Sequence, residues 1–363
     1  MSRKVIIITN IPTPYRVLLF DQLSSIFNGD LFVVYYKKIE KNREWNIPKM
    51  SNNSFFLKNT IFARFNIHFD IFPFLIKEKP DIIIAAGFTP TIIFAFIYSK
   101  LSSKKFIVFT DSWLHSVQQL KFYHRLIRKY IIPRADASIA VGKKGVKYLL
   151  KYGSNLKSIF ISPLAIDNSY YLKFYKPIDK KKFDVIFSGQ FIERKMPFFV
   201  IEVLKGLQEK NYNVKFLLIG SGPLEREIIK QLVEYNICYI YPGFIQQEDL
   251  PKYYSNSKLL LFPTTDDPWG LVANEACAVG TPVITCENAG VANDLVIHNY
   301  NGYVLPLSLE VWVKYTLSLL QNNDLLEQFS KNSIQQVKNY SIEKGALGII
   351  DSIEFVFKHE HKK

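Results

Sequence analysis

The chain has 363 residues, 48% of them hydrophobic and 15% aromatic, so it is long enough to form two domains with buried cores. Its formal net charge of +14 is unevenly placed, since residues 1–180 hold 28 Lys and Arg against 11 Asp and Glu, and the remainder hold 18 against 21. The three cysteines, Cys238, Cys277 and Cys286, follow no metal-binding spacing, and their odd number does not suggest a disulfide framework. Both observations favour a reducing compartment.

The first half of the chain has apolar, β-branched runs followed by turn residues, a pattern typical of buried parallel strands. It predicts strands over 4–9, 30–36, 81–86, 106–110 and 135–141, and helices over 17–27 and 142–152. The apolar stretch 82–98 is interrupted by Gly87 and Pro90, so we expect strand, turn and buried helix there rather than a membrane span. The N-terminal apolar run 5–8 is too short for a signal peptide.

The positive charge of the first half indicates an anionic partner. Nucleic acid is one candidate, and an anionic membrane surface or a lipid phosphate is the other. We favour the membrane, because the cations of residues 121–130 accompany aromatic and aliphatic side chains, and such a helix can lie in a membrane interface. A solvated basic helix is the alternative. We therefore expect the inner face of the cell membrane as a partner and no nucleic acid.

The second half repeats the alternation of apolar strands and helices, which is typical of an open parallel sheet. It predicts strands over 183–188, 214–219, 239–241, 259–262 and 283–285, and helices over 198–210, 247–255, 271–279, 309–321, 325–332 and 342–357. Residues 170–182 are polar and are expected to form a connector. The predicted domains are thus 1–170 and 180–340, followed by a C-terminal segment, 341–363.

Two carboxylates flank the helix predicted at 271–279. Asp267 is at its entrance and Glu275 follows eight residues later, on the order of 12 Å along a helix axis and roughly on one side. The amides at Gly270, Leu271 and Val272 would be first-turn donors, which suit a phosphate. The pattern fits a nucleotide sugar, with pyrophosphate between ribose and sugar. The alternative is an ordinary helix with Asp267 as its N-cap.

The string from Asp267 to Ala276 resembles the signature of glycosyltransferase family 4, which consists of retaining enzymes of GT-B fold, with Asp267 where the commoner form has Glu. The segment from Gly189 to Lys195 resembles the Gly-Arg-Leu-x-x-x-Lys segment of the same family. Lys195 falls on its lysine, whereas Gln190 replaces its first basic residue and Arg194 could supply the missing charge.

This resemblance implies an α/β fold of two Rossmann-like domains facing a central cleft, with the nucleotide sugar in the C-terminal domain and the acceptor in the N-terminal one. In GT-B proteins the last helix commonly crosses back to the first domain, and the C-terminal helix in 341–363 could do so here. Asp267 would contact the sugar and Glu275 the ribose hydroxyls, while Lys195 and Arg194 would stabilise the leaving pyrophosphate. The remaining donor-binding candidates are Gly189, Gly270, Leu271, Val272, and the backbone at Phe244 and Ile245.

The candidates in the first domain are Thr13, Arg16, Asp111 and His115. Arg16 follows the first strand and could meet a phosphate, or it could be an ordinary surface arginine. Many family members have a His-Asp pair at the end of the strand predicted at 106–110. Here the matching pair is Thr110 and Asp111, and His115 lies a few residues further on, either in the cleft or as a loop histidine.

The sequence therefore predicts a retaining, metal-independent hexosyltransferase. It would move a sugar from a nucleotide-diphosphate sugar to a lipid-linked or oligosaccharide acceptor in capsule or lipopolysaccharide biosynthesis, in the cytoplasm at the inner membrane face. No cofactor and no metal are expected, since no Asp-x-Asp pair occurs. The alternatives are a phosphorylase or epimerase of the same fold, and a non-catalytic nucleotide-sugar-binding or scaffolding subunit of a glycosyltransferase complex.

Overall fold

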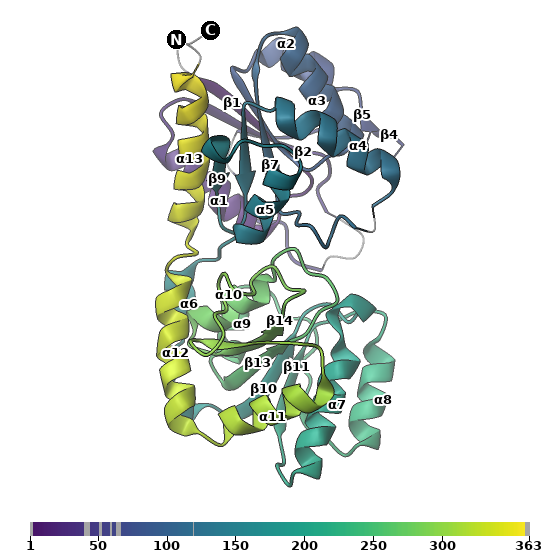
Figure 1. Ribbon diagram of the computed structural model, residues 1–363, viewed down its shortest axis with the longest axis vertical. Coiled ribbons are helices and arrows are strands. Elements are labelled where there is room, and N and C mark those ends of the chain that lie inside the picture. The colour runs from purple at the N-terminus through teal and green to yellow at the C-terminus, as the bar shows by residue number, and fades with distance from the viewer. Residues whose placement is uncertain are drawn as a thin grey trace. The chain divides into compact units, whose positions relative to one another are not determined.

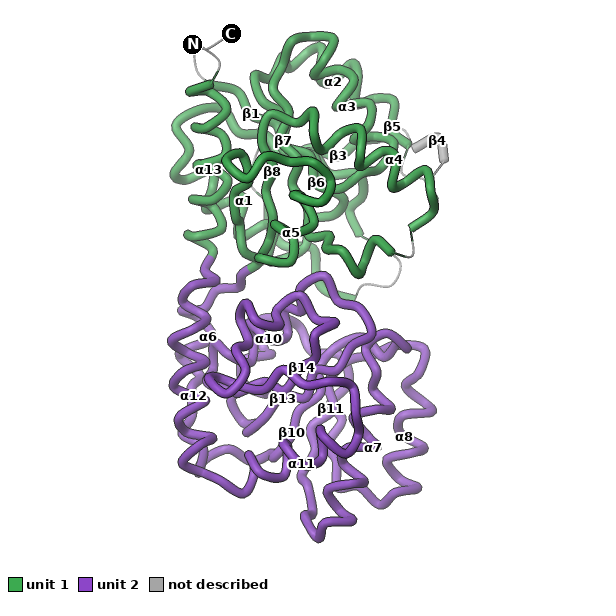
Figure 2. The backbone as a smooth tube through the Cα atoms, viewed as in Figure 1, with its two compact units in different colours: residues 1–164, 342–363 green, residues 165–341 purple. Residues whose placement is uncertain are grey.

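The computed structural model describes residues 3–39, 44–50, 53–58, 60–62, 67–118 and 120–359. The chain divides into two compact units, residues 1–164 with 342–363, and residues 165–341 (Figure 2). Each unit is built on its own parallel β-sheet with helices packed around it (Figure 1). The division at 164/165 lies earlier than the predicted boundary at 170–180, and the C-terminal helix, for which a return to the first domain was expected, belongs to the first unit.

The first unit has a seven-stranded sheet in the order β3-β2-β1-β6-β7-β8-β9, with every neighbouring pair parallel. Val5 to Ile8 are fully buried, as expected for a central strand covered on both faces. β4 and β5 form a separate antiparallel pair. The strand bounds are β1 Lys4–Thr9, β2 Asp30–Tyr35, β3 Ser54–Phe56, β4 Thr60–Phe62, β5 Ile67–His68, β6 Ile82–Ala86, β7 Lys105–Thr110, β8 Ala137–Ala140 and β9 Ile159–Ile161.

The helices of the first unit include one from the far end of the sequence. They are α1 Pro14–Ile26, α2 Ile71–Glu78, α3 Pro90–Leu101, α4 Phe122–Ile131, α5 Lys143–Lys151 and α13 Ile342–Lys358. α13 packs against α1 and β9 (Figure 1). A Cβ atom on Gly348 would lie 1.9 Å from the carbonyl oxygen of Ile161, so only glycine allows this close approach. Residues 360–363 of the predicted C-terminal segment lie outside the described residues.

The stretch predicted as strand, turn and buried helix, 82–98, has this structure, because β6 is followed by a turn at Gly87 and then by α3. Every helix in the described part of the chain is too short or too polar to cross a bilayer.

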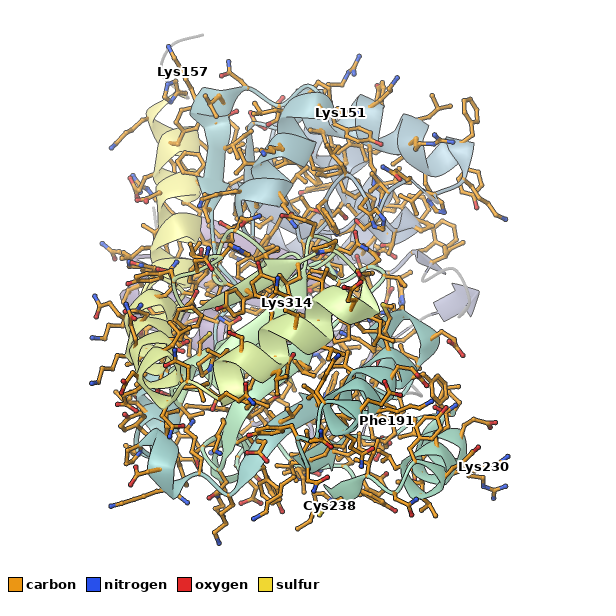
Figure 3. All side chains as sticks on the ribbon, turned by 60° about the horizontal axis from the view of Figure 1, so that its bottom comes forward. Lys151, Lys157, Phe191, Lys230, Cys238 and Lys314 are labelled. Atoms are coloured by element: carbon orange, nitrogen blue, oxygen red, sulfur yellow. The ribbon has the colours of Figure 1, made fainter. Side chains whose placement is uncertain are left out.

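The second unit has a six-stranded parallel sheet in the order β12-β11-β10-β13-β14-β15. Its strands are β10 Phe183–Ser188, β11 Lys215–Ile219, β12 Cys238–Ile240, β13 Ser257–Phe262, β14 Val283–Cys286 and β15 Gly302–Leu305. Its helices are α6 Asn168–Leu172, α7 Pro197–Glu209, α8 Glu225–Glu234, α9 Leu250–Tyr254, α10 Leu271–Ala278, α11 Leu309–Leu320 and α12 Asn323–Val337. Figure 3 shows Phe191 among packed side chains, whereas Lys230 and Cys238 lie at the surface.

The segment predicted as a polar connector, 170–182, lies inside the second unit, because the division between the units is at 164/165. α6 occupies its first residues, and Lys181 is buried at its end. The ammonium group of Lys181 donates to the carbonyl oxygens of Ser257 and Gly280 and to the Thr281 hydroxyl, at 2.8 to 3.1 Å. A lysine-rich composition suggests a solvated linker, but three acceptors that converge from distant residues hold this lysine inside the second unit.

Candidate functional site

Two turns meet at the carboxyl edge of the second sheet, one after β10 and one after β13, which are neighbouring strands. The carbonyl oxygen of Arg194 accepts hydrogen bonds from the Thr264 hydroxyl at 2.8 Å and from the Thr265 backbone N–H at 3.0 Å. In return, the Arg194 guanidinium donates to the carbonyl oxygen of Asp266 at 2.9 Å. These reciprocal bonds fix the two turns against each other and thereby position the neighbouring Lys195 and Asp267.

Lys195 and Asp267 form an ion pair through Nζ and Oδ2. Arg194 Nη1 lies 3.9 Å from the same carboxylate oxygen, and the Trp269 backbone N–H donates to the other oxygen at 3.2 Å. Asp267 is only 7% exposed, whereas the side chain of Arg194 is 40% exposed. The Asp267 carboxylate is thus within 4 Å of two cations, and Arg194 is the more exposed of the two.

Asp267 is not the N-cap of α10, so that alternative is wrong. Gly270 has this position with φ +103°, and a Cβ there would lie 2.3 Å from the ring of Phe262. The backbone of Asp267 is bonded to the loop after β14, through the Asn288 carbonyl oxygen at 3.0 Å and the Gly290 N–H at 2.8 Å. Since the helix begins only at Leu271, the helical-rise estimate of the separation between the two carboxylates does not apply.

The amides of Leu271 and Val272 are at the start of α10, as predicted, where a helix has donors without intrahelical partners and a partial positive charge. The Trp269 indole N–H donates to Asn274 Oδ1 at 2.8 Å, and both side chains are buried. This bond fastens the preceding turn to the first turns of the helix. The amides are therefore held beside the Lys195–Asp267 pair.

Glu275 is nearly buried on α10, with 8% of its surface exposed. Its Oε2 accepts a hydrogen bond from the Tyr254 hydroxyl at 2.8 Å. Burial raises the pKa of Glu275 to about 7, against an opposing effect of the Tyr254 bond. Sequence reasoning missed Tyr254, because it belongs to another helix, α9, and no spacing rule connects it with Glu275.

The other donor-binding candidates lie around the end of β10 and the loop after β12. The N–H of Gly189 donates to the Ile219 carbonyl oxygen at 3.1 Å, and the Gly243 carbonyl oxygen accepts from Gly220 N–H at 3.1 Å. The side chains of Phe244 and Ile245 line a groove of about 710 Å³ that also contains residues from the start of β10. The predicted backbone contact of this loop with a base stays a prediction.

In the first unit, the candidates come from the segments after β1 and β7. Thr13 is the N-cap of α1 and Arg16 is in its first turn. Each is 6% exposed, so Arg16 is not a surface arginine. Asp111 directly follows β7 at the same edge of the sheet. The ring of His115 packs on Trp113 with 5.2 Å between centroids.

Residues 172–336 match the family model of glycosyl transferases group 1, a range that covers nearly all of the second unit. The capsular polysaccharide biosynthesis glycosyltransferase CapM of Staphylococcus aureus is 26% identical over 195 residues, which cover 53% of this chain and 50% of CapM. An uncharacterized glycosyltransferase of Methanocaldococcus jannaschii is 28% identical over 131 residues, 34% of this chain and 32% of that protein. These alignments span from a third to half of the relatives' length.

Solved structures are similar over almost the whole chain. Anabaena HepE, in complex with UDP and glucose, has a TM-score of 0.76 at 14% identity, over 97% of this chain and 99% of HepE. Sucrose-phosphate synthase from Thermosynechococcus elongatus has a TM-score of 0.78 at 19% identity, over 99% of this chain and 100% of that chain. At such identities the similarity shows the fold. The second unit of this chain thus matches the model of glycosyl transferases group 1 over nearly its whole length, and both units are Rossmann-like domains of the GT-B fold.

Proposed function

We propose that this chain transfers a hexose-type sugar from a nucleoside-diphosphate sugar to a glycan or lipid-linked acceptor, with retention of the anomeric configuration. The observation that carries the proposal is the Lys195–Asp267 pair beside the first amides of α10. It puts a cation, a carboxylate and helix N–H donors at the carboxyl edge of a parallel sheet, where such sheets bind nucleotides.

In this proposal, Lys195 exchanges the Asp267 carboxylate for an oxygen of the donor's diphosphate. Arg194 and the amides at the start of α10 add further positive potential, so that the leaving diphosphate is stabilised without a metal ion. Asp267, released from Lys195, contacts the sugar, and Glu275 accepts hydrogen bonds from the ribose hydroxyls.

The transfer step needs no protein nucleophile. The acceptor hydroxyl attacks the anomeric carbon on the face that the diphosphate leaves. The bond between the anomeric carbon and the diphosphate oxygen breaks, and that oxygen takes the proton of the acceptor. The new glycosidic bond then has the configuration of the old one.

The biological setting is supported by the relatives. CapM is named for capsular polysaccharide biosynthesis, and a protein of the same fold, WaaG, is described as involved in lipopolysaccharide biosynthesis. UDP, glucose and UDP-glucose are bound in the HepE structures. We propose that this chain also acts in the assembly of a surface polysaccharide, at the cytoplasmic face of the membrane.

Helix α4 of the first unit supports a membrane partner. Large apolar side chains are exposed on it, among them Phe122 at 68%, Tyr130 at 57% and Leu126 at 47%. The same helix and its N-cap carry the basic residues Lys121, Arg125 and Lys129, which would meet an anionic surface while the apolar groups enter the interface. Nucleic acid would use the cations but would leave these apolar side chains exposed.

The test is the thermal stability of the protein with UDP, GDP, dTDP, CDP and ADP, measured on the wild type and on Glu275→Ala. A ligand at one hundred times its Kd adds about 2.7 kcal/mol to the free energy of unfolding, which shifts Tm by several degrees. We expect one nucleotide to shift the wild type and not the variant, while Glu209→Ala, an exposed acid on α7 of the same unit, responds normally.

The absence of a shift with all five nucleotides would contradict the donor site. A shift without release of nucleoside diphosphate from the matching donor, in the presence of membrane extract as acceptor, would instead favour the non-catalytic subunit.

A further inference from the structure

Arg16 is a buried cation that forms no ion pair with the described residues and has an unsatisfied donor. It is 6% exposed, its Nη1 makes no hydrogen bond, and no carboxylate among the described residues forms an ion pair with it. The hydroxyl of Thr13, one turn earlier and equally buried, also makes no hydrogen bond. Since a desolvated charge without a partner is costly, native proteins rarely keep one except where a ligand completes it.

The neighbours of Arg16 leave its hydrogen-bonding edge unused. Its guanidinium carbon lies 5.0 Å from the centre of the Phe109 ring and 5.9 Å from that of Tyr15. Such cation–π contacts engage the face of the planar group and not its N–H donors. Burial raises the pKa of the nearby Tyr35, so this phenol is neutral and offers no negative charge. The donors of Arg16 therefore stay available to a ligand.

The chemistry of a guanidinium decides what this ligand is. Its fork of N–H donors matches two oxygens of a phosphate or a carboxylate, and its charge is permanent. Arg16 belongs to the segment that follows β1, and Phe109 beneath it belongs to β7, so the site is at the carboxyl edge of the first sheet.

We propose that Arg16 binds an oxyanion of the acceptor, which is either the phosphate of a lipid-linked acceptor or the carboxylate of an acidic sugar. This inference rests on the proposed glycosyl transfer. It adds that the acceptor carries a negative charge on the group that binds Arg16. Thr13 donates a further hydrogen bond to the same oxyanion.

The experiment measures Tm of the full chain in inorganic phosphate, with potassium chloride holding the ionic strength constant. We expect phosphate to stabilise the wild type clearly more than Arg16→Met. Any response that Arg16→Met keeps comes from the donor site and should be lost when Lys195→Met is added. Arg134→Met is the matched control, since Arg134 is an exposed arginine of the same unit that lies 4.1 Å from the centre of the Tyr130 ring. It should respond as the wild type does.

Without phosphate, Arg16→Met should be at least as stable as the wild type, because it removes an unpaired buried charge. A purely structural arginine would give the opposite result, a loss of stability that is equal with and without phosphate, and this would overturn the proposal. Should Arg16→Met fail to fold, Arg16→Lys keeps the charge but loses the fork, and a weaker response to phosphate is expected. An unchanged response would also overturn it.

Two further probes separate the sources of the oxyanion. Stabilisation by glycerol phosphate but not by glucuronate supports a lipid-linked phosphate, and the reverse supports an acidic sugar. The nucleotide that stabilises the wild type should still stabilise Arg16→Met but not Lys195→Met. If Arg16→Met loses this response as well, Arg16 belongs to the donor site and the acceptor assignment is wrong. If none of the five nucleotides stabilises the wild type while phosphate does, the donor proposal fails and the anion site stands.

Discussion

Replacing Glu275 by Gln should stabilise the protein in a pH-dependent way. The pKa of this carboxyl rises from an ordinary value of 4.5 to about 7 because of burial. Between these two pH values, folding is therefore coupled to the uptake of a proton. Ionisation of the buried carboxyl lowers the free energy of unfolding, by little below pH 4.5 and by its full amount above pH 7. Gln keeps the shape and can still accept the Tyr254 hydrogen bond, but it carries no charge.

The magnitude follows from the shift. Each pKa unit corresponds to about 1.4 kcal/mol, so the ionised form lowers the free energy of unfolding by about 3 kcal/mol above pH 8 and by less than about 1 kcal/mol at pH 5. For a unit of this size, about 3 kcal/mol corresponds to roughly 6–12 °C in Tm. Glu275→Gln should thus melt well above the wild type at pH 8.5, and close to it at pH 5.

Scanning calorimetry of the two proteins at both pH values, without nucleotide, measures this difference. Glu209→Gln, the same change at an exposed position of the second unit, controls for net charge and should show little difference at either pH. If Glu275→Gln changes Tm equally at pH 5 and pH 8.5, or lowers it at pH 8.5, the ionised carboxylate does not destabilise the folded protein and the reasoning is refuted.

Three other changes test neighbouring features. Tyr254→Phe removes a hydrogen bond to the Glu275 carboxylate, so it should weaken nucleotide binding by about 1.5–3 kcal/mol and move the pH optimum of binding upward. Titration calorimetry at pH 6 and pH 8 measures both effects, and a pH dependence equal to that of the wild type would contradict the prediction. Gly270→Ala should lower the free energy of unfolding clearly more than Gly243→Ala. Both glycines have positive φ (+103° and +85°), but only at Gly270 would the added Cβ clash with an aromatic ring. Equal urea midpoints of the two variants would contradict this. Leu126→Ser should weaken sedimentation with vesicles containing phosphatidylglycerol, whereas Leu101→Ser, at a position 81% exposed on the same unit, should not, and equal losses would remove α4 as the docking helix.

The alternation of buried strands and helices was predictable because it is a local property. The run from Val5 to Ile8 is apolar and β-branched, and such a run is typical of a strand covered on both faces. The start of α10 was predictable for the same reason, since Gly270 precedes a helix-forming segment and its first amides have no intrahelical partners. The family resemblance rested on these same local strings, and the match over residues 172–336 confirms it at the level of group 1.

The burial of Lys181, within the segment predicted as a polar connector, could not be predicted because burial is not a local property. Lysine and tyrosine suggest solvent when they are counted along the chain, yet Lys181 is enclosed by acceptors that lie 76 to 100 residues further on. The interpretation of Arg16 as a surface residue was wrong for the same reason, because the ring of Phe109 that covers it comes from a strand far along the sequence.

The sequence by itself determined the two α/β halves, the carboxylates at Asp267 and Glu275, and the cations at Arg194 and Lys195. The tertiary structure decided how these groups are connected: Lys195 pairs with a carboxylate 72 residues away, and Glu275 is bonded to Tyr254 on another helix. The physical reason is that strand order in a parallel sheet follows from packing and not from chain order. β10 lies beside β13, and so the turns after these two strands are joined into one site.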